Sequence, residues 1–412
     1  MKDTELYRRL LGLEDPWFVD RVELKMDEER VDVWVKHRRG TRWKCPECDQ
    51  VLACHDHAEE RSWRHLDTCQ VKTFLRARIP RVNCAEHGVV QVRTPWAESR
   101  SRFTLLMESF AITVLSQAAT IKAAAGILRI SWDEAWGIME RAVSRGLARR
   151  DRQVPRYIGV DEKAFRKGHS YLTIVSDIEE GTVVHVARDR KLESLESYFQ
   201  RFSREELASI EGLAMDMWVP YVSATLKWVP NAGTKIVFDR FHIMQHVTKA
   251  VDQVRREEQW ELRGRGSRAL HKTRFLWLYS EENLPDQHRA RFDELIELNL
   301  KVGRAWAIKE SLRELWEYAS PGWARRFFKR WHAWAVLSKL PPIRRVAKML
   351  RDRLDHIVTF RKHRITQGVA EGLNSKIMAI KRYACGFRNH SHFETAIYFH
   401  CGGLDLVPRN PR

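Results

Sequence analysis

Two short apolar runs that each end in an aspartate decide the fold: Tyr157-Ile-Gly-Val-Asp161 and Gly212-Leu-Ala-Met-Asp216. Between them, β-branched residues are frequent at 170–176 and 182–187, on either side of Glu179-Glu-Gly181. Two such runs around a glycine turn are typical of a β-hairpin. The region is therefore predicted to begin with three strands, and a fourth follows in the second aspartate-tipped run.

The rest of this region alternates between helix and strand. Residues 192–202 and 219–229 have the apolar spacing of helices, and a last strand is predicted at Lys235-Ile-Val-Phe-Asp239. The order of three strands, helix, strand, helix and strand predicts a mixed sheet with helices on its faces.

The aspartates at the strand ends are candidate metal ligands. Side chains alternate between the faces of a strand, so Gly159 and Ala214 share a face with Asp161 and Asp216 and leave room around each carboxylate. On adjacent strands the two carboxylates would repel each other unless a cation lay between them. Carboxylate oxygens are the ligands that Mg²⁺ takes. The alternative is that each aspartate only ends a strand or caps a helix.

A third carboxylate is predicted far downstream, at Glu371 within residues 367–382. Helical spacing predicts that an apolar stripe of this segment lies on the sheet: Val369, Leu373, Ile377 and Ile380. The opposite, mainly polar face then holds Glu371, Asn374, Ser375, Met378 and Arg382. The alternative is an ordinary solvated face.

These motifs carry a resemblance to a known family. Asp161 in GVDE, Asp216 in AMDMW, DRFH at 239–242, and AEGLNSKIMAIKR followed by GFRN resemble the ISL-three insertion-sequence family of bacterial DDE transposases. The match runs over nearly the whole chain, from the cysteine-rich start to the GFRN region. The resemblance implies a transposase that binds the terminal inverted repeats of its element and catalyses metal-dependent DNA cleavage and strand transfer.

The resemblance also implies roles for individual residues. It implies an RNase H-like core whose triad is Asp161, Asp216 and Glu371, holding two Mg²⁺ (or Mn²⁺) ions. Asp239 and His242 match the family's Asp-x-x-His signature and are expected near the triad and the scissile phosphate. Three further residues are expected to support catalysis, the last two by contacting phosphates as His242 would: Asn374, Lys381 and Arg382.

The composition agrees with a nucleic-acid partner. In 412 residues, Lys plus Arg exceed Asp plus Glu by 72 to 54, which gives a net charge of +18 and a pI near 9.7. A polyanion is the natural partner, and no apolar run approaches the length of a transmembrane helix, so double-stranded DNA fits better than a membrane. Bringing two element ends together predicts at least a homodimer. The N-terminus has no secretory signal, so a bacterial cytoplasmic protein associated with the nucleoid is expected.

Five of the seven cysteines fall between Cys45 and Cys84, and an odd total argues against a disulfide framework. Cys45-Pro-Glu-Cys48 and Cys84-Ala-Glu-His87 form two knuckles separated by predicted strands, including 73–79. They predict a zinc ribbon with a closed, structural Cys₃His site. Two unrelated knuckles are the alternative, and four other side chains compete for a ligand position: Cys54, His55, His57 and Cys69.

Three helices are predicted between the zinc ribbon and the sheet. One spans 104–118, Thr120 can cap a second at 121–128, and Ser131-Trp-Asp-Glu134 is a capping box that begins a third. A short turn followed by a well-capped helix is typical of a helix-turn-helix motif, with 132–145 as the recognition helix. Its expected DNA contacts are Trp132, Arg141 and Arg145. A plain three-helix bundle is the alternative.

Asp216 and Glu371 are too far apart for one connection, so residues 245–360, which are helical in pattern, are predicted to be an inserted unit. Between Arg325 and Arg364 there are 13 Lys or Arg residues against two acidic ones. Four cations here are expected to contact DNA: Arg325, Arg326, Lys329 and Arg330. Most tryptophans of the segment are expected in its core, although one or two could stack on an unpaired base: Trp306, Trp316, Trp323, Trp331 and Trp334.

The predicted architecture is a multidomain α/β protein in which an RNase H-like mixed sheet is interrupted by an all-α insertion and preceded by a zinc ribbon and a helix-turn-helix domain. The expected segments are a zinc ribbon, the helix-turn-helix domain, the first part of the core, the basic helical insertion and the last part of the core: 1–98, 99–150, 151–245, 246–362 and 363–412. Two other functions fit parts of this pattern. One is a transcriptional regulator with a non-catalytic sheet, and the other is a structure-specific nuclease that cuts without joining.

Overall fold

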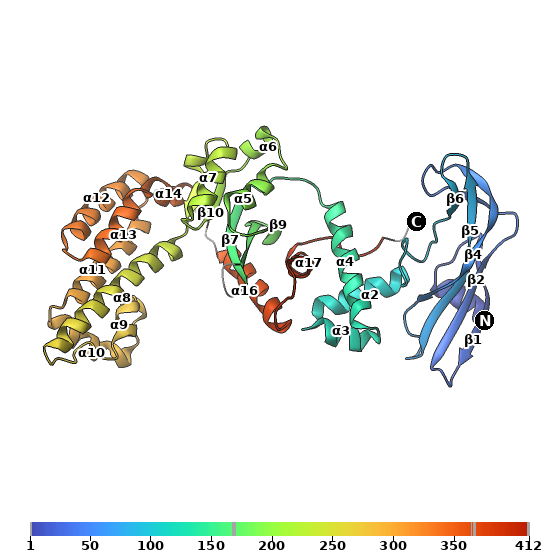
Figure 1. Cartoon of the computed structure of the whole chain (residues 1–412), viewed down its shortest axis with the longest axis horizontal. Coiled ribbons are helices and arrows are strands. Elements are labelled where there is room, and N and C mark those ends of the chain that lie inside the picture. The colour runs from blue at the N-terminus through green and yellow to red at the C-terminus, as the bar shows by residue number, and fades with distance from the viewer. Residues whose placement is uncertain (1, 167–169, 364, 366–367, 410–412) are drawn as a thin grey trace. The chain divides into compact units, whose positions relative to one another are not determined.

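The computed structural model describes residues 2–166, 170–363, 365 and 368–409. The chain divides into two compact units: Met1–Asp151 with Ile380–Arg412, and Arg152–Ala379. Figure 1 labels the elements of both units. No helix within the described ranges is long and apolar enough to cross a membrane.

The first unit contains a six-stranded sheet preceded by α1 (Asp3–Leu10). The strands run in the order β1-β2-β5-β4-β3, and β6 pairs with β5. Trp63, Leu75 and Ile79 are fully buried in its core. The strand predicted at 73–79 lies within β5 of the observed set: β1 (Trp17–Lys25), β2 (Arg30–His37), β3 (Arg42–Lys44), β4 (Val51–Arg64), β5 (Lys72–Cys84) and β6 (Gly88–Gln91).

Three helices follow this sheet: α2 (Leu105–Gln117), α3 (Ile121–Leu128) and α4 (Trp132–Arg149). Each begins after a residue whose side chain accepts a backbone N–H of the first turn, namely Thr104, Thr120 and Ser131. Ser131 and Glu134 form the predicted capping box. Because these caps depend on nearby residues alone, the sequence predicts the helix starts well.

The end of the chain belongs to the first unit. The helix α17 (His390–Cys401) packs against α4, where the rings of Trp136 and His392 lie 4.4 Å apart. The predicted last segment of the core, 363–412, is thus divided between the two units, and α16 (Gly368–Tyr383) begins in the second unit and ends in the first.

The second unit contains a five-stranded sheet in the order β11-β10-β7-β8-β9. Strands β7, β10 and β11 are parallel, whereas β8 is antiparallel to both β7 and β9. The order of elements is the predicted one with a short additional helix, α6: β7 (Tyr157–Arg166), β8 (Ser170–Asp177), β9 (Thr182–Arg188), α5 (Leu192–Phe199), α6 (Arg204–Ala208), β10 (Gly212–Met215), α7 (Val219–Trp228), η1 (Ala232–Thr234) and β11 (Ile236–Phe238).

The two faces of this sheet bury different side chains. Ile158, Leu213 and Phe238 join a large apolar core that includes residues of α5 and α7. On the other face, Ala214 and Val237 pack with Ile365, just before α16. Alternation along the strands therefore directs small side chains and the terminal aspartates towards the face that α16 covers.

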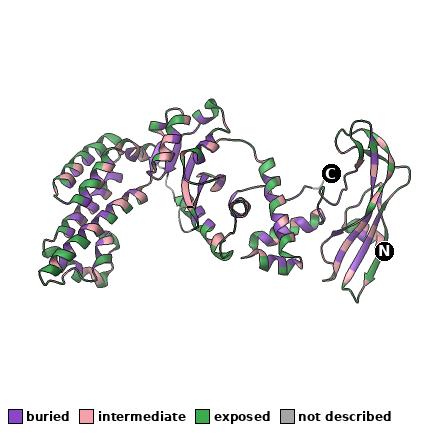
Figure 2. Ribbon diagram, viewed as in Figure 1, coloured by how far each residue is buried: buried purple, intermediate pink, exposed green. Residues whose placement is uncertain are grey.

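The described residues between β11 and α16 are mainly helical, and α8, α11, α12 and α13 pack side by side in a bundle (Figure 1). Their apolar faces are buried within the bundle (Figure 2). Trp316 and Trp331 are core residues and the half-buried Trp306 packs against the core, so three of the five tryptophans are placed as predicted, whereas Trp323 and Trp334 are exposed. The elements are α8 (Arg240–Gly264), α9 (Arg274–Leu278), η2 (Glu281–Asn283), α10 (Asp286–Glu297), α11 (Lys301–Leu312), η3 (Arg313–Trp316), α12 (Pro321–Leu337), α13 (Pro341–Arg351), α14 (Leu354–Val358) and α15 (Phe360–His363).

Candidate active site and zinc centre

Three aspartates occupy equivalent positions on neighbouring parallel strands. Asp216 and Asp239 come directly after β10 and β11, whereas Asp161 lies in the middle of β7, which continues to Arg166 instead of ending at the aspartate as predicted. Met215 at the end of β10 pairs with Val160 of β7 and with Phe238 of β11. The residue after each of these three positions is an aspartate: Asp161, Asp216 and Asp239. Side chains at equivalent positions of adjacent strands lie on the same face, so the three carboxylates lie level with one another on one face of the sheet.

Glycines on the same face let the segment around α16 approach the strands closely. A Cβ on Gly159 would lie 3.5 Å from Cβ of Ala370 and only 2.6 Å from Oγ of Ser176. A Cβ on Gly212 would lie 2.9 Å from Cδ1 of Ile365. The small residues that precede the aspartates thus have a packing role as well as leaving space near the carboxylates.

Asp161 is held by groups from two elements. The side-chain amide of Asn374 on α16 donates a hydrogen bond to its Oδ2, and Nζ of Lys163 lies 3.2 Å from the same oxygen. The backbone N–H of Glu162 donates to Oδ1 at 2.6 Å. Lys163 is a residue of this site that the sequence reasoning missed, although its position two residues after Asp161 places it on the same face.

Asp216 faces the first turn of α8. Its Oδ2 lies 4.0 Å from Nδ1 of His242, and its Oδ1 accepts the backbone N–H of Met217. The two residues of the Asp-x-x-His motif thus have different structural roles. Asp239 begins α8, and His242, one turn later, turns towards Asp216.

Asp239 is the N-cap of α8, and its Oδ1 accepts the backbone N–H of Phe241. Its Oδ2 is buried without a hydrogen-bond partner in the described part of the chain. Burial raises the pKa of this carboxyl, and the negative charges of Asp216 and Asp161 raise the pKa further. The uncompensated oxygen and the neighbouring charges are features of a site that accepts a cation.

The observed orientation of α16 differs from the prediction. The buried stripe consists of Ala370, Leu373, Asn374 and Ile377, whereas Val369 is exposed. Asn374, which was predicted on the outer polar face, is therefore turned inward. Its hydrogen bond to Asp161 compensates for burial of the amide, an interaction that hydrophobic periodicity does not reveal.

The three predicted triad carboxylates are not equally close. Asp161 and Asp216 follow paired strand residues, whereas Glu371 is exposed on α16 and its side chain makes no hydrogen bond to another described residue. Within the described ranges, the three oxygens do not form a group with every ligand atom inside 4.8 Å of the others. Lys381 and Arg382 lie in the last turn of α16, which belongs to the other unit, so their phosphate contacts stay a prediction.

The four predicted zinc ligands do form such a group. The ligand atoms of Cys45, Cys48, Cys84 and His87 all lie within 4.8 Å of one another. The Sγ atoms of Cys48 and Cys84 are 3.7 Å apart, which fits the ~3.8 Å edge of a tetrahedron with Zn–S bonds of about 2.3 Å. Backbone N–H groups of Glu86 and His87 lower the pKa of the Cys84 thiol, which favours the thiolate that binds zinc.

The competing residues lie outside this group. Cys54, His55, His57 and Cys69 contribute no atom to it. His57 instead stacks on His37, with the two Nε2 atoms 2.8 Å apart. The paired spacing of the knuckles therefore identified the cluster correctly.

The arginines expected to contact DNA from α4 have partners within the fold. Arg145 is nearly buried and forms ion pairs with Glu98 and Glu108, and it also donates to the carbonyl oxygen of Leu406. Arg141 pairs with Glu108 at 3.0 Å. This arrangement argues against Arg145 as a DNA contact, because its guanidinium stabilises the unit instead. Trp132 is 43% exposed and stacks on Trp136.

The cations predicted on the helical bundle lie on the exposed side of α12. Arg325 pairs with Asp355 at 2.8 Å, and Arg326 lies over the ring of Trp323. Lys329 and Arg330 are exposed on the same helix. Their position permits contact with DNA, and the contact itself stays a prediction.

Comparison with known families gives three consecutive matches. Residues 41–87 match the zinc finger of transposases IS204/IS1001/IS1096/IS1165, and residues 92–143 match the helix-turn-helix domain of transposase family ISL3. Residues 158–397, more than half of the chain, match the transposase domain of the same family. The predicted order of a zinc ribbon, a helix-turn-helix domain and a transposase domain is thus confirmed.

Whole-length relatives agree. The chain is 27% identical over 421 aligned residues to the transposase for insertion sequence element IS1557 of two Mycobacterium tuberculosis strains, which covers 94% of this chain and 93% of the relative. It is 26% identical over 398 residues to the transposase for element IS1001 of Bordetella parapertussis, covering 95% and 97% of the two chains. The chain therefore belongs to the ISL3 family of transposases and is a DNA transposase.

Proposed function

We propose that Asp161, Asp216 and Glu371 are the catalytic carboxylates of this transposase and that they bind two Mg²⁺ ions in an RNase H-like core. The observation that carries the proposal is the alignment of aspartates at equivalent positions of adjacent parallel strands, on the face that the helix with Glu371 covers. In this proposal residues 151–245 and 363–379 form the core, and the helical segment 246–362 is an insertion in it.

The direction in which Glu371 projects from α16 supports its assignment as the third catalytic carboxylate. Cγ1 of Val369 lies 3.7 Å from the position of a Cβ on Gly181, so Val369 leans towards the turn between β8 and β9. Two positions later on a helix, a side chain points about 200° away. Glu371 therefore projects towards the other flank of β7, where β10 brings Asp216.

The residues present fit a divalent cation. The site offers hard carboxylate oxygens. Burial is the first cause that raises the pKa of Asp239 and of Glu162, and the negative charges of Asp161 and Asp216 raise both pKa values further. Bound Mg²⁺ would supply Lewis-acid polarisation of a phosphodiester and a lowered pKa for the attacking water. Asp239, with its buried unpartnered oxygen, is a supporting residue of the same site.

The protein's own groups position the reactants. Asn374 and Lys163 fix the orientation of the Asp161 carboxylate, and His242 can donate to a phosphate oxygen beside Asp216. Preorganised groups of this kind act by orientation and by neutralising charge that develops on the phosphate. Water attacks the phosphodiester at the element end first, and the freed 3′-hydroxyl then attacks target DNA at the same site.

The helix-turn-helix domain and the basic bundle are proposed to bind the terminal inverted repeats and the target duplex. Two ends must be joined to one target, so at least a dimer is proposed for the active complex. The zinc site is proposed to hold the N-terminal sheet together rather than to take part in the reaction.

Amide substitutions test the catalytic assignment. Asp161→Asn, Asp216→Asn and Glu371→Gln are each expected to lower the cleavage rate at least ~100-fold while binding to DNA ends is retained. The matched control is Glu180→Gln, an exposed acid in the turn between β8 and β9. Cleavage and joining are scored together on labelled ends. Joining by any of the three variants at the wild-type rate would refute the assignment.

A further inference from the structure

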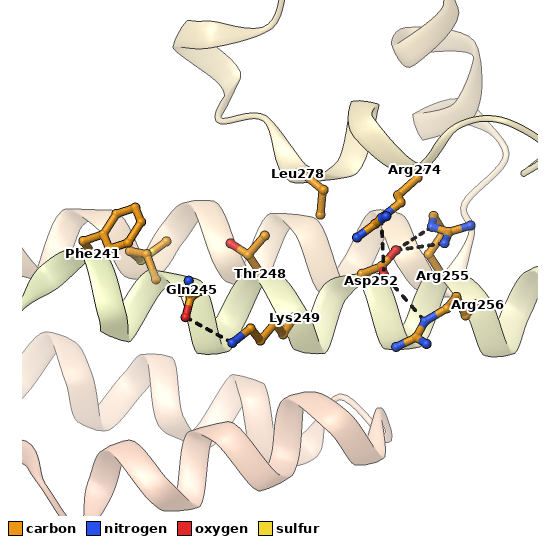
Figure 3. A pocket seen from close by; sticks show the side chains of 10 residues that line it. Phe241, Gln245, Thr248, Lys249, Asp252, Arg255, Arg256, Arg274 and Leu278 are labelled. Atoms are coloured by element: carbon orange, nitrogen blue, oxygen red, sulfur yellow. Dashed lines mark hydrogen bonds and ion pairs between the residues drawn. The ribbon is translucent and has the colours of Figure 1, made fainter. Parts of the chain in front are cut away.

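The first half of α8 forms one wall of a groove, and α9 forms the other (Figure 3). The groove has a volume of about 590 Å³, which lies in the range of ~300–1,000 Å³ found for ligand sites. It is lined by Phe241, Met244, Gln245, Thr248, Lys249, Asp252, Arg255, Arg256, Arg274 and Leu278. The α8 residues recur every three or four positions, so they occupy one face of the helix.

The groove carries a positive charge that its own acid only partly balances. The carboxylate of Asp252 is shared by three guanidinium groups, with nitrogen–oxygen distances of 2.8 Å to Arg255, 3.5 Å to Arg256 and 3.6 Å to Arg274. Lys249 adds a fourth cation, so four positive groups face one negative group. Because the side chains of Arg256 and Arg274 are 65% and 58% exposed, they can reach an anion in the groove.

An exposed aromatic ring lies at the end of the groove nearest the sheet. Phe241 is 57% exposed, although burial of such a ring would normally be favourable. The next residue is His242, whose Nδ1 is 4.0 Å from the Asp216 carboxylate. The ring of Phe241 therefore adjoins the candidate active site, and the cations follow it along α8 (Figure 3).

We propose that this groove binds a single DNA strand that runs on from the scissile phosphate. An unpaired base stacks on Phe241, and the following phosphates contact Lys249, Arg256 and Arg274. The ring selects a single strand because only an unpaired base presents its face to a side chain. This inference rests on the proposed position of the active site at Asp161 and Asp216. It identifies single-stranded DNA as the ligand of the groove beside that site.

The distances along α8 suit such a strand. From Phe241 to Arg256 the helix advances 15 residues, or about 22 Å at 1.5 Å per residue. The groove thus extends over several nucleotides, with the aromatic ring at one end and paired arginines at the other. A cationic track with an aromatic platform is the arrangement by which proteins bind single strands without reading their sequence.

Binding measurements on the full-length, zinc-loaded protein test the proposal, without added Mg²⁺ so that cleavage plays no part. The ligand is a fluorescent 20-nucleotide oligodeoxythymidine, and a 20-base-pair duplex is compared with it. Phe241→Leu keeps an apolar side chain but removes the aromatic face, and it is expected to weaken binding of the single strand about 5- to 100-fold. Phe241→Trp is expected to preserve or strengthen it.

Salt dependence tests the cations separately. Arg256→Gln is expected to lower the slope of log affinity against log salt by about 0.7, the value for one phosphate contact on a single strand. Arg304→Gln, an exposed arginine of α11 outside the groove, is the matched control and is expected to leave the slope unchanged. A photoreactive benzophenone at position 241 should form an adduct with the oligonucleotide, and one at Leu298 should not.

Wild-type affinity in Phe241→Leu, an equal loss of duplex affinity, or equal adduct yields at positions 241 and 298 would each overturn the proposal. These outcomes are independent of the catalytic assignment, because none of them requires cleavage. Wild-type cleavage by Asp161→Asn would refute the catalytic carboxylates even if the groove variants lose single-strand binding.

Discussion

The side-chain amide of Asn374 donates a hydrogen bond to a carboxylate oxygen of Asp161, 213 positions earlier in the chain. This contact joins α16 to the middle of β7 and orients the Asp161 carboxylate. Glu371 lies one turn before Asn374 on the same helix, so the hydrogen bond also fixes how far Glu371 stands from the sheet.

Replacing Asn374 tests this positioning role. Asn374→Ala is expected to raise the Mg²⁺ concentration for half-maximal cleavage about 10- to 100-fold, because removing the hydrogen-bond partner of a metal ligand weakens metal binding by about this factor. The effect should be mainly on metal dependence, with the rate at saturating Mg²⁺ less affected. Asn374→Gln, which retains the amide, should recover part of the loss. Equal metal dependence in Asn374→Ala and the wild type would contradict the role.

Gly159 is predicted to be required for the packing of β7 against its neighbours. Gly159→Ala places a Cβ 2.6 Å from Oγ of Ser176, and such overpacking costs roughly 1–3 kcal/mol of unfolding free energy. Removing the obstructing hydroxyl in Gly159→Ala with Ser176→Ala should restore part of the stability. Urea denaturation of the single and double variants measures the coupling, and strictly additive effects would show that the contact is not the cause.

Loss of a zinc ligand should unfold the N-terminal sheet. Cys84→Ala is expected to abolish zinc binding, because binding of a structural zinc supplies folding free energy directly. The near-ultraviolet circular dichroism of the Trp17 and Trp43 pair, whose rings are 5.0 Å apart, reports the packing of this sheet. Cys54→Ala is the matched control and should retain one zinc per chain. Native dichroism in zinc-free protein would disprove a structural role.

Arg145 is predicted to stabilise the first unit rather than to bind DNA. Among the described residues, Arg145→Ala leaves the buried Glu108 with only Arg141 as an ionic partner, and breaking a buried pair costs about 3–5 kcal/mol. Replacing the acid as well, in Arg145→Met with Glu108→Leu, should recover much of the loss. DNA affinity of the folded double variant should equal that of the wild type. A selective loss of DNA affinity without loss of stability would instead support Arg145 as the DNA contact that the sequence predicted.

Stability should fall in mildly acidic solution through His65. Burial, and then the nearby Arg64 charge, lowers the pKa of this imidazole to about 4, and its Nδ1 lies 2.8 Å from the hydroxyl oxygen of Thr104. Folded His65 stays neutral while the unfolded chain takes up a proton below about pH 6.5. The contribution of neutral His65 to the free energy of unfolding is therefore fully present above pH 6.5 and is lost as the pH falls from 6.5 to 4.

Between pH 7.5 and 5.5 the expected loss of unfolding free energy is about 1.4 kcal/mol. His65→Asn keeps a hydrogen-bonding group for Thr104 but cannot titrate, so its unfolding free energy should fall correspondingly less over this interval. His55→Asn, at an exposed position, should follow the wild type. Urea denaturation at the two pH values measures the unfolding free energy of each variant. An equal loss between pH 7.5 and 5.5 in His65→Asn and the wild type would refute the assignment of this pH dependence to His65.

The features that the sequence predicts well are those with local causes. The caps at Thr104, Thr120 and Ser131 and the cysteine knuckles depend on residues a few positions apart, and each was located correctly. The two strands that carry Asp161 and Asp216 were predicted from alternation and small neighbours, although β7 continues to Arg166, beyond the predicted end at Asp161. Their adjacency depends on pairing between distant segments, which the pattern of apolar residues made plausible but did not determine.

The features that it did not predict depend on tertiary partners. Asn374 has a polar side chain, so periodicity assigned it to the outer face, whereas Asp161 makes its burial favourable. The pairing of Arg145 depends on Glu98 and Glu108, which lie on other segments, although a glutamate in the apolar start of α2 was a signal that a buried cation was needed. The groove arises only when α9 folds back against α8.

A single uninterrupted helix, α8, leads from the edge that carries Asp239 to the basic groove. One inserted or deleted residue between His242 and Lys249 would turn everything beyond it by about 100° and shift it by about 1.5 Å. Phe241 and the cations would then face different directions. Relatives that use the same surface should therefore keep this stretch at constant length, while length variation is tolerated in the loops that follow Gly264.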